Sequence, residues 1–147
     1  MSLKSKLSQP VARRIAQREN RRALNGAKKQ RLVLKELLKK AQQTAFGIDH
    51  GLNPRMSEED FRKAVPVRDY EALKPWVDRA VGGEKDVLWP GKPLYFCKTS
   101  GTTSGAKYIP LTRDSMPNHL GSARNALLAY IAETGNSGFL DGKMIFL

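Results

Sequence analysis

Residues 98–107 read KTSGTTSGAK, and this run decides both the fold class and the chemistry that we expect of the chain. It combines several hydroxyl side chains with two glycines and ends on Lys107. The apolar residues 94–97 before it predict a buried strand, and residues 108–111 after it predict another extended segment. Backbone N–H groups and hydroxyls that converge on a glycine-rich loop bind anions. The sequence therefore predicts a phosphate-binding loop between two strands.

Helical patterns dominate the chain on both sides of this loop. Pro10 begins the first predicted helix, which ends near Asn25 and Gly26, and Gly47 closes the second. The predicted helices cover residues 10–25, 28–46, 57–64, 70–81 and 112–134. An apolar strand is predicted over residues 143–147. A helical region followed by strands indicates the α/β class, with the helices packed on the start of a mixed sheet.

Several residues mark where these helices begin and which faces they bury. Ser57 and Asp60 resemble a capping box, Asp69 is a predicted N-cap, and Thr112 is a predicted N-cap for the last helix. Pro75 lies inside the helix over residues 70–81, so that helix is predicted to be short or kinked. Apolar residues at helical spacing predict buried faces on two helices: Leu34, Leu37, Leu38, Ala41 and Ala45 on one, and Leu120, Ala123, Leu127, Leu128 and Ile131 on the other.

The positive charge of the chain is concentrated near its N-terminus. The 147 residues carry a net charge of +12, but residues 1–40 hold 13 Lys/Arg against two acidic residues, a balance of +11. The remaining residues, which include the glycine-rich loop, have a balance of only +1. This concentration of basic residues has three possible explanations. The residues could form a solvated helix face, they could cover an acidic surface elsewhere in the protein, or they could bind nucleic acid or an anionic membrane.

The cysteine and histidine content argues against a metal site and against secretion. The single cysteine, Cys97, has no partner for an internal disulfide, which fits a reducing compartment, and its apolar neighbours predict a small core residue. His50 and His119 lack the spacing of metal ligands. No apolar run approaches the length of a membrane span. We expect a cytoplasmic protein without a metal held by its side chains.

The loop does not have the spacing of a Walker motif. That motif needs two glycines separated by four residues, then lysine and Ser/Thr at the start of a helix. Here Gly101 and Gly105 are separated by three residues, Ala106 precedes Lys107, and Tyr108 stands in place of the hydroxyl. The segment that follows contains Pro110 and is predicted to be extended. A P-loop NTPase is therefore excluded.

The loop resembles instead the phosphate loop of acyl-adenylate-forming enzymes, a Ser/Thr/Gly-rich run between two strands that ends in lysine. Lys107 stands six positions after Gly101, as in the general pattern, but Ser104 is inserted before Gly105 and the usual proline before the lysine is missing. With these two differences, the loop resembles that of the auxin-responsive-promoter family, which comprises the acyl-acid amido synthetases of plants and their bacterial relatives.

Other segments carry the same resemblance over most of residues 30–147, and the likeness is greatest to the bacterial branch. They are TAFG at 44–47 with His50 and Gly51, VPVRDYE at 65–71, and PLT at 110–112. In the plant pattern the lysine lies one residue further on.

The resemblance implies a two-step ligase reaction with ATP and Mg²⁺, in which a small-molecule carboxylic acid is adenylated and its acyl group then passes to an amine, typically an amino acid. The implied phosphate-binding residues are Ser100, Gly101, Thr102, Thr103, Ser104, Gly105 and Lys107. The hydroxyls would donate to phosphate oxygens, the glycines would permit close backbone approach, and Lys107 would neutralise charge. No residue of this chain is assigned a catalytic role, and nucleic acid and membranes are not among the implied partners.

The resemblance also implies how the chain is organised. Residues 1–93 would form a mostly helical N-terminal region, and residues 94–147 would form the strand–phosphate loop–strand–helix–strand start of an incomplete adenylation core. We therefore expect an N-terminal fragment that does not form amides alone. The non-enzymatic alternative is a basic helical module that binds nucleic acid or an anionic surface, with affinity that falls steeply with salt.

Overall fold

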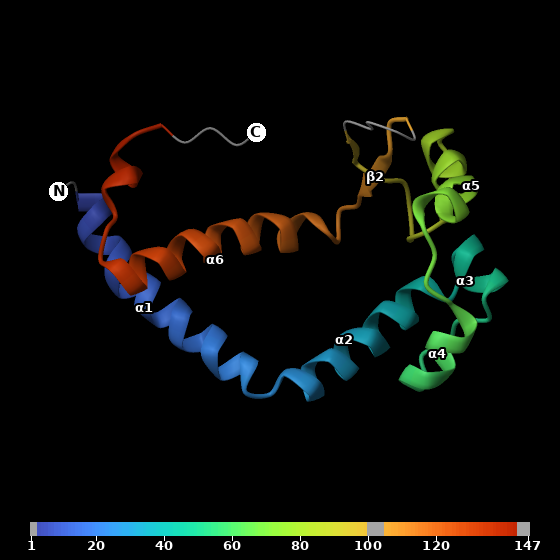
Figure 1. The fold of residues 1–147 in the computed structure, drawn as a ribbon, viewed down its shortest axis with the longest axis horizontal. Helices are drawn as coiled ribbons and strands as arrows, with labels where there is room; N and C mark the ends of the chain where they lie inside the picture. Colours follow the sequence, from blue (N-terminus) through green and yellow to red (C-terminus); the bar gives the residue numbers. More distant parts are fainter. Residues whose placement is uncertain (1–2, 100–104, 144–147) are drawn as a thin grey trace. The chain divides into compact units, whose positions relative to one another are not determined.

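The structure is a computed structural model that describes residues 3–99 and 105–143 (Figure 1). Its elements in chain order are α1 (Leu3–Ala23), α2 (Gly26–Ala41), α3 (Ala45–Asp49), α4 (Glu58–Ala64), α5 (Tyr70–Val81), β1 (Tyr95–Lys98), β2 (Tyr108–Leu111), α6 (Met116–Thr134) and the 3₁₀ turn η1 (Gly138–Asp141). The predicted α/β class is confirmed as a mostly helical chain with a small sheet. Residues 144–147 of the last predicted strand lie outside the described residues.

The chain divides into two compact units: Met1–Gly26 with Pro117–Leu147, and Ala27–Met116. In the second unit, α3, α4 and α5 gather at the C-terminal end of α2, and the two strands lie beside α5 (Figure 1). Leu38, Leu52, Val77, Ala80 and Val87 form its buried apolar core. In the first unit, Ala12 of α1 and Ile131 of α6 are buried, and the Gln9 side chain donates to the carbonyl of Gly135 at 3.0 Å.

The prediction of one long helix over residues 28–46 is wrong, because α2 ends at Ala41 and a separate helix, α3, begins at Ala45. Thr44 is extended and caps the short helix α3, its hydroxyl accepting the N–H of Gly47 at 3.0 Å. The amides of Ala45 and Phe46 leave the helical pattern and donate to the carbonyls of Asp86 and Val87 at 2.8 and 3.0 Å. Apolar periodicity continues through the break, so it could not reveal that tertiary partners compete for these amides.

Glycine is required at position 47 for a steric reason. A Cβ placed there would lie 1.9 Å from the carbonyl oxygen of Ala41. The absent side chain lets α3 fold back onto the end of α2. Phe46 of α3 then stacks on His50, with ring centroids 3.9 Å apart, and meets the edge of Trp76 of α5 at 5.4 Å.

The short helices obey their capping signals. Ser57 and Asp60 form the predicted capping box, each side chain accepting the backbone N–H of the other. Asp69 caps α5, its carboxylate accepting the N–H of Ala72 at 2.9 Å. Pro75 is accommodated within α5, which runs to Val81 before Gly82 and Gly83. These starts were predictable because a cap depends on residues within one helical turn.

Two predicted helix starts are wrong. The helix α1 begins at Leu3, so Pro10 lies inside it and removes one backbone hydrogen bond instead of starting the helix. Thr112 does not cap α6 directly. It forms a turn with Ser115, in which Thr112 N–H donates to Ser115 Oγ at 2.9 Å and Ser115 N–H donates to Thr112 Oγ1 at 3.1 Å, and α6 begins at Met116 with Pro117 in its first turn.

The predicted apolar faces are covered only in part. On α2, Leu38 is buried and Leu34 is half-buried, whereas Leu37 is exposed. On α6, Ile131 is 1% exposed but Leu120 is 65% exposed. A mostly apolar groove of about 430 Å³ runs along α6, lined mainly by the predicted apolar face of that helix and by Leu140 of η1. Helical spacing places these residues on one face but does not provide a covering layer.

Replacing Gly47 by alanine tests the steric constraint. We expect Gly47→Ala to lower the free energy of unfolding by about 2–3 kcal/mol, because the new methyl group must displace the Ala41 carbonyl. Urea denaturation followed by circular dichroism measures the loss. Gly26→Ala is the control, since nothing lies within 4 Å of a Cβ there. Equal stability of the two variants would contradict the explanation.

The hydroxyl of Thr44 offers a second test. This side chain is 1% exposed, donates to the Ala41 carbonyl at 2.7 Å and accepts from Gly47. Thr44→Val keeps the shape but removes the acceptor of the buried Gly47 N–H, whereas the Ala41 carbonyl keeps the backbone N–H of Thr44 at 2.9 Å, so we expect a loss of about 1–3 kcal/mol in the same denaturation experiment. Thr44→Ser retains the hydroxyl and should lose less. A valine variant at least as stable as the serine variant would exclude this role for the hydroxyl.

Candidate functional site

The candidate site is a β-hairpin with the glycine-rich loop at its tip. Strands β1 and β2 are antiparallel, and the register pairs Lys98 with Tyr108 and Tyr95 with Leu111. One pair beyond the strands, the N–H of Thr99 donates to the carbonyl of Lys107 at 3.0 Å. Thr99 and Lys107 therefore form the base of the loop. The loop itself is residues 100–106.

The structure describes two of the seven predicted phosphate-binding residues. Gly105 has φ +81, a conformation that L side chains rarely adopt, with no atom within 4 Å of the position of a Cβ. Glycine is thus needed there for its backbone conformation rather than for space. Lys107 is half-buried at the base of the loop. The other five, Ser100, Gly101, Thr102, Thr103 and Ser104, lie outside the described residues.

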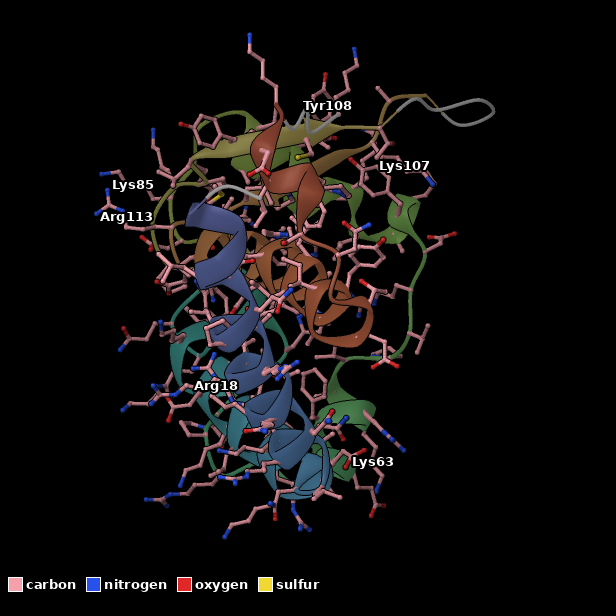
Figure 2. All side chains as sticks on the ribbon, turned by 90° about the vertical axis from the view of Figure 1, so that its left-hand side faces the viewer. Arg18, Lys63, Lys85, Lys107, Tyr108 and Arg113 are labelled. Atoms are coloured by element: carbon pink, nitrogen blue, oxygen red, sulfur yellow. The ribbon has the colours of Figure 1, made fainter. Side chains whose placement is uncertain are left out.

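One aromatic side chain contacts both the backbone and the lysine at the end of the loop. Tyr70, the first residue of α5, accepts the N–H of Tyr108 through its hydroxyl at 2.8 Å. The ammonium of Lys107 lies over the Tyr70 ring, 5.5 Å from its centroid. Figure 2 shows Lys107 between the loop end of the hairpin and the start of α5. The sequence marked Tyr70 only as part of a family resemblance, because 38 residues separate it from Tyr108.

The strand predicted at residues 94–97 is present as β1, but its predicted burial is wrong. Tyr95 is 64% exposed, Leu94 is exposed, and Cys97 is exposed rather than a core residue. On the other face of β1, Phe96 is half-buried and meets Tyr108 edge-on at 6.4 Å. Apolar composition predicted burial on both faces. In the described part of the chain, however, the sheet has only two strands, and the face that carries Tyr95 and Cys97 is left open.

Asp114 ties the other end of the hairpin to two distant segments. Its carboxylate accepts from the ammonium of Lys40 at 2.6 Å and from the indole N–H of Trp89 at 3.1 Å. The hydrogen bond from Lys40, followed by that from Trp89, holds the pKa of Asp114 below its usual value. The connector that carries Trp89 is closed by Asp86, whose side chain accepts the N–H of Gly91 at 2.6 Å. Neither Asp114 nor Asp86 was singled out from the sequence.

Acid should weaken the interactions of the Asp114 carboxylate with Lys40 and Trp89. Because the pKa of Asp114 is lowered in the folded protein, its contribution to stability is complete above the unfolded pKa, near 3.8, and is lost as the pH falls through the lowered folded value. We therefore expect Asp114→Asn to be less stable than the parent protein at pH 7, with the difference vanishing in strong acid. Thermal unfolding from pH 7 to pH 2 measures it. Glu36→Gln, at an exposed position of α2, should give a small difference. A difference for Asp114→Asn that does not change with pH would contradict the assignment.

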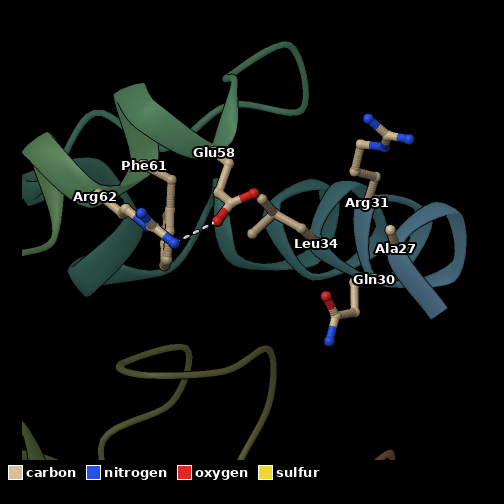
Figure 3. A pocket seen from close by; sticks show the side chains of 7 residues that line it. All are labelled: Ala27, Gln30, Arg31, Leu34, Glu58, Phe61 and Arg62. Atoms are coloured by element: carbon tan, nitrogen blue, oxygen red, sulfur yellow. Dashed lines mark hydrogen bonds and ion pairs between the residues drawn. The ribbon is translucent and has the colours of Figure 1, made fainter.

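A separate groove of about 330 Å³ lies between α2 and α4 (Figure 3). Leu34 and Phe61 provide its apolar surface, and an ion pair of 2.6 Å between Arg62 and Glu58 lies at its rim. Arg31 projects from α2 beside it (Figure 3). None of the residues predicted to contact phosphate lines this groove.

The described residues contain neither a cluster that could hold a metal nor a helix that could span a membrane. In residues 3–99 and 105–143, no three side chains of His, Cys, Asp and Glu come together in a way that could hold a metal ion. No described helix combines the length and the apolar character that a bilayer span requires. The basic side chains Lys85 and Arg113 project away from the ribbon (Figure 2).

The helices and the hairpin that carries the hydroxyl- and glycine-rich sequence together form a mostly helical α/β chain. The model of the GH3 family N-terminal domain matches residues 17–147. The chain belongs to the GH3 family. The predicted resemblance to the auxin-responsive acyl-acid amido synthetases is thereby confirmed.

Three of the proteins that resemble this chain are plant synthetases. The chain is 31% identical over 126 residues to indole-3-acetic acid-amido synthetase GH3.5 of Arabidopsis thaliana, covering 84% of this chain and 20% of the relative. It is 30% identical over 115 residues to GH3.15 of the same plant, covering 77% and 19%. It is 30% identical over 90 residues to jasmonoyl–L-amino acid synthetase JAR6 of Nicotiana attenuata, covering 57% and 16%. The chain spans about a fifth of the length of the first two relatives.

Proposed function

We propose that this chain supplies the ATP-binding hairpin of an acyl-acid amido synthetase. The observation that carries the proposal is the hairpin of a GH3-family chain whose loop is rich in hydrogen-bond donors and whose base holds Lys107 beside Tyr70. The names of the relatives support the ligase class, since they include an indole-3-acetic acid-amido synthetase and a jasmonoyl–L-amino acid synthetase. The particular acid and amine of this protein are not assigned.

The proposed reaction has two steps. A carboxylate oxygen of the acid attacks the α-phosphorus of ATP, the bond to the β-phosphate oxygen breaks, and pyrophosphate leaves. The amine of an amino acid then attacks the acyl carbon of the adenylate, AMP leaves, and the amine loses a proton as the amide forms. In the first step positioning and charge stabilisation supply most of the catalysis.

The donor set of the hairpin suits a phosphate chain. Ser100, Thr102, Thr103 and Ser104 carry hydroxyls that would donate to the β- and γ-phosphate oxygens, and Gly101 and Gly105 would leave their backbone amides accessible. Lys107 would add a positive point charge. Mg²⁺ would be held largely by the phosphates, because the described residues contain no carboxylate cluster of the kind that binds a metal alone.

The proposed partners are therefore small molecules: ATP, a carboxylic acid and an amine, rather than nucleic acid or a membrane. The basic charge belongs to residues 1–40, whereas the part with the hairpin is nearly neutral. A charge run on helices is most often a solvated face. Together with a single free cysteine, Cys97, these partners favour a cytoplasmic location.

Removing two loop hydroxyls tests the proposal. We expect the double change Thr102→Ala and Thr103→Ala to weaken binding of Mg-ATP at least about tenfold, because hydrogen bonds to a charged group contribute about 1.5–3 kcal/mol each. Isothermal titration of the protein with Mg-ATP measures the affinity, and exchange of labelled pyrophosphate into ATP measures the first step in the full-length protein. Ser122→Ala, at an exposed hydroxyl of α6, is the matched control.

The same experiment separates the enzyme from the basic binding module. Removal of residues 1–25 should leave the affinity for ATP unchanged if the hairpin is the site. A protein that binds nucleic acid with a steep salt dependence, and keeps that binding when the loop hydroxyls are removed, would favour the non-enzymatic alternative. Unaltered ATP binding in the Thr102 and Thr103 double variant would refute the proposed site.

A further inference from the structure

We propose that Tyr70 is a positioning residue that sets both the backbone at the end of the phosphate loop and the direction of the Lys107 ammonium. This inference rests on the proposed function for the role of Lys107, but the contacts themselves can be tested without any nucleotide. The two contacts come from one side chain: the hydroxyl accepts the N–H of Tyr108, and the ring lies under the ammonium of Lys107.

The hydrogen bond lies on the outer edge of the hairpin. Thr99 N–H donates to the Lys107 carbonyl, so these two residues are a hydrogen-bonded pair of the ladder. The N–H of the next residue, Tyr108, then points away from β1, and Tyr70 accepts it at 2.8 Å. The residue with the same outward direction further along β2 is Pro110, which has no N–H. Tyr70 therefore satisfies an edge donor directly beside the loop, where an unpaired amide would leave the backbone free to shift.

The contact with Lys107 orients a charge without neutralising it. The ammonium lies 5.5 Å from the centroid of the Tyr70 ring, within the range of a cation–π interaction. In the described part of the chain no carboxylate forms an ion pair with Lys107, although several other basic residues have such partners. An aromatic ring restricts the lysine side chain and leaves its full charge available to an anion. A carboxylate in the same place would compete with phosphate.

The position of Tyr70 is itself set by the helix that follows it. Asp69 caps α5 through the N–H of Ala72 at 2.9 Å, which places Tyr70 in the first turn. Val77 and Ala80, further along the same helix, are buried in the core of this unit. A side chain held by a capped, anchored helix has the rigidity that a positioning residue needs. The end of the loop is thus positioned by a contact with α5 as well as by the pairing of its own strands.

Three variants separate the two contacts. Tyr70→Phe keeps the ring but removes the acceptor, Tyr70→Leu removes both, and Lys107→Met removes the charge. Tyr95→Leu is the control, because this tyrosine lies on the same hairpin and is 64% exposed. The 147-residue chain has four tyrosines, so ¹⁵N-tyrosine labelling resolves the Tyr108 amide, which the loss of one signal in Tyr108→Phe assigns.

The first readout needs no nucleotide. We expect hydrogen exchange of the Tyr108 amide to accelerate at least about tenfold in both Tyr70→Phe and Tyr70→Leu, because both lose the acceptor. The ε-methylene signal of Lys107, followed by ¹³C labelling, should show a ring-current shift in the parent and in Tyr70→Phe that disappears in Tyr70→Leu. Tyr95→Leu should change neither. Unchanged exchange in Tyr70→Phe, or an unchanged lysine signal in Tyr70→Leu, would overturn the inference.

The second readout asks whether Tyr70 acts through Lys107. We expect Tyr70→Leu to weaken Mg-ATP binding about five- to tenfold in the parent and by a smaller factor in Lys107→Met, where the contact with the ammonium is already absent and only the backbone hydrogen bond is lost. An equal loss in both backgrounds would show a merely structural role and overturn the inference. If the parent does not bind ATP, the proposed function fails, whereas the exchange and ring-current measurements still decide whether Tyr70 positions the loop.

Discussion

The second unit depends on the absence of a side chain at position 47. A single Cβ there would lie 1.9 Å from the Ala41 carbonyl, and without it the chain turns sharply from α2 into α3. The turn presents the amides of Ala45 and Phe46 to the carbonyls of Asp86 and Val87 in the connector. It also brings the ring of Phe46 into a cluster with the rings of His50 and of Trp76 of α5. The absence of a side chain at position 47 thus permits the turn that brings α2, the connector and α5 into contact.

That junction leads by short steps to the candidate site. Helix α5 is anchored by Val77 and Ala80 at one end and capped by Asp69 at the other, and its first residue contacts the end of the loop. The connector carries Trp89, which together with Lys40 binds Asp114 after the second strand. The hairpin is therefore held at both ends by segments that come before it in the chain. A loop that binds phosphate gains from such support, because pre-ordered donors lose less entropy on binding.

Much of the local structure could be predicted, and the reason is the range of the interactions. The capping box of Ser57 and Asp60 and the Asp69 cap each depend on residues three positions apart, so the starts of α4 and α5 were correct. The predicted end of α2 was wrong because the amides of Ala45 and Phe46 donate to carbonyls more than forty positions further along the chain instead of continuing the helix. The burial of Cys97 was wrong because composition shows that a residue can be buried but not whether another layer covers it.

The sequence alone determined the α/β class, the family resemblance, and the candidate loop with Lys107 at its end, because the order and spacing of hydroxyls, glycines and lysine and the extended segments on either side are all local features. It also showed that the positive charge lies in the first forty residues and not at the loop. Only the tertiary structure revealed that Tyr70 meets Tyr108 and Lys107, and that Asp114 joins Lys40 to Trp89. These contacts link residues 25–74 positions apart, and no local pattern encodes them, because they arise only when packing of the helices brings distant segments together.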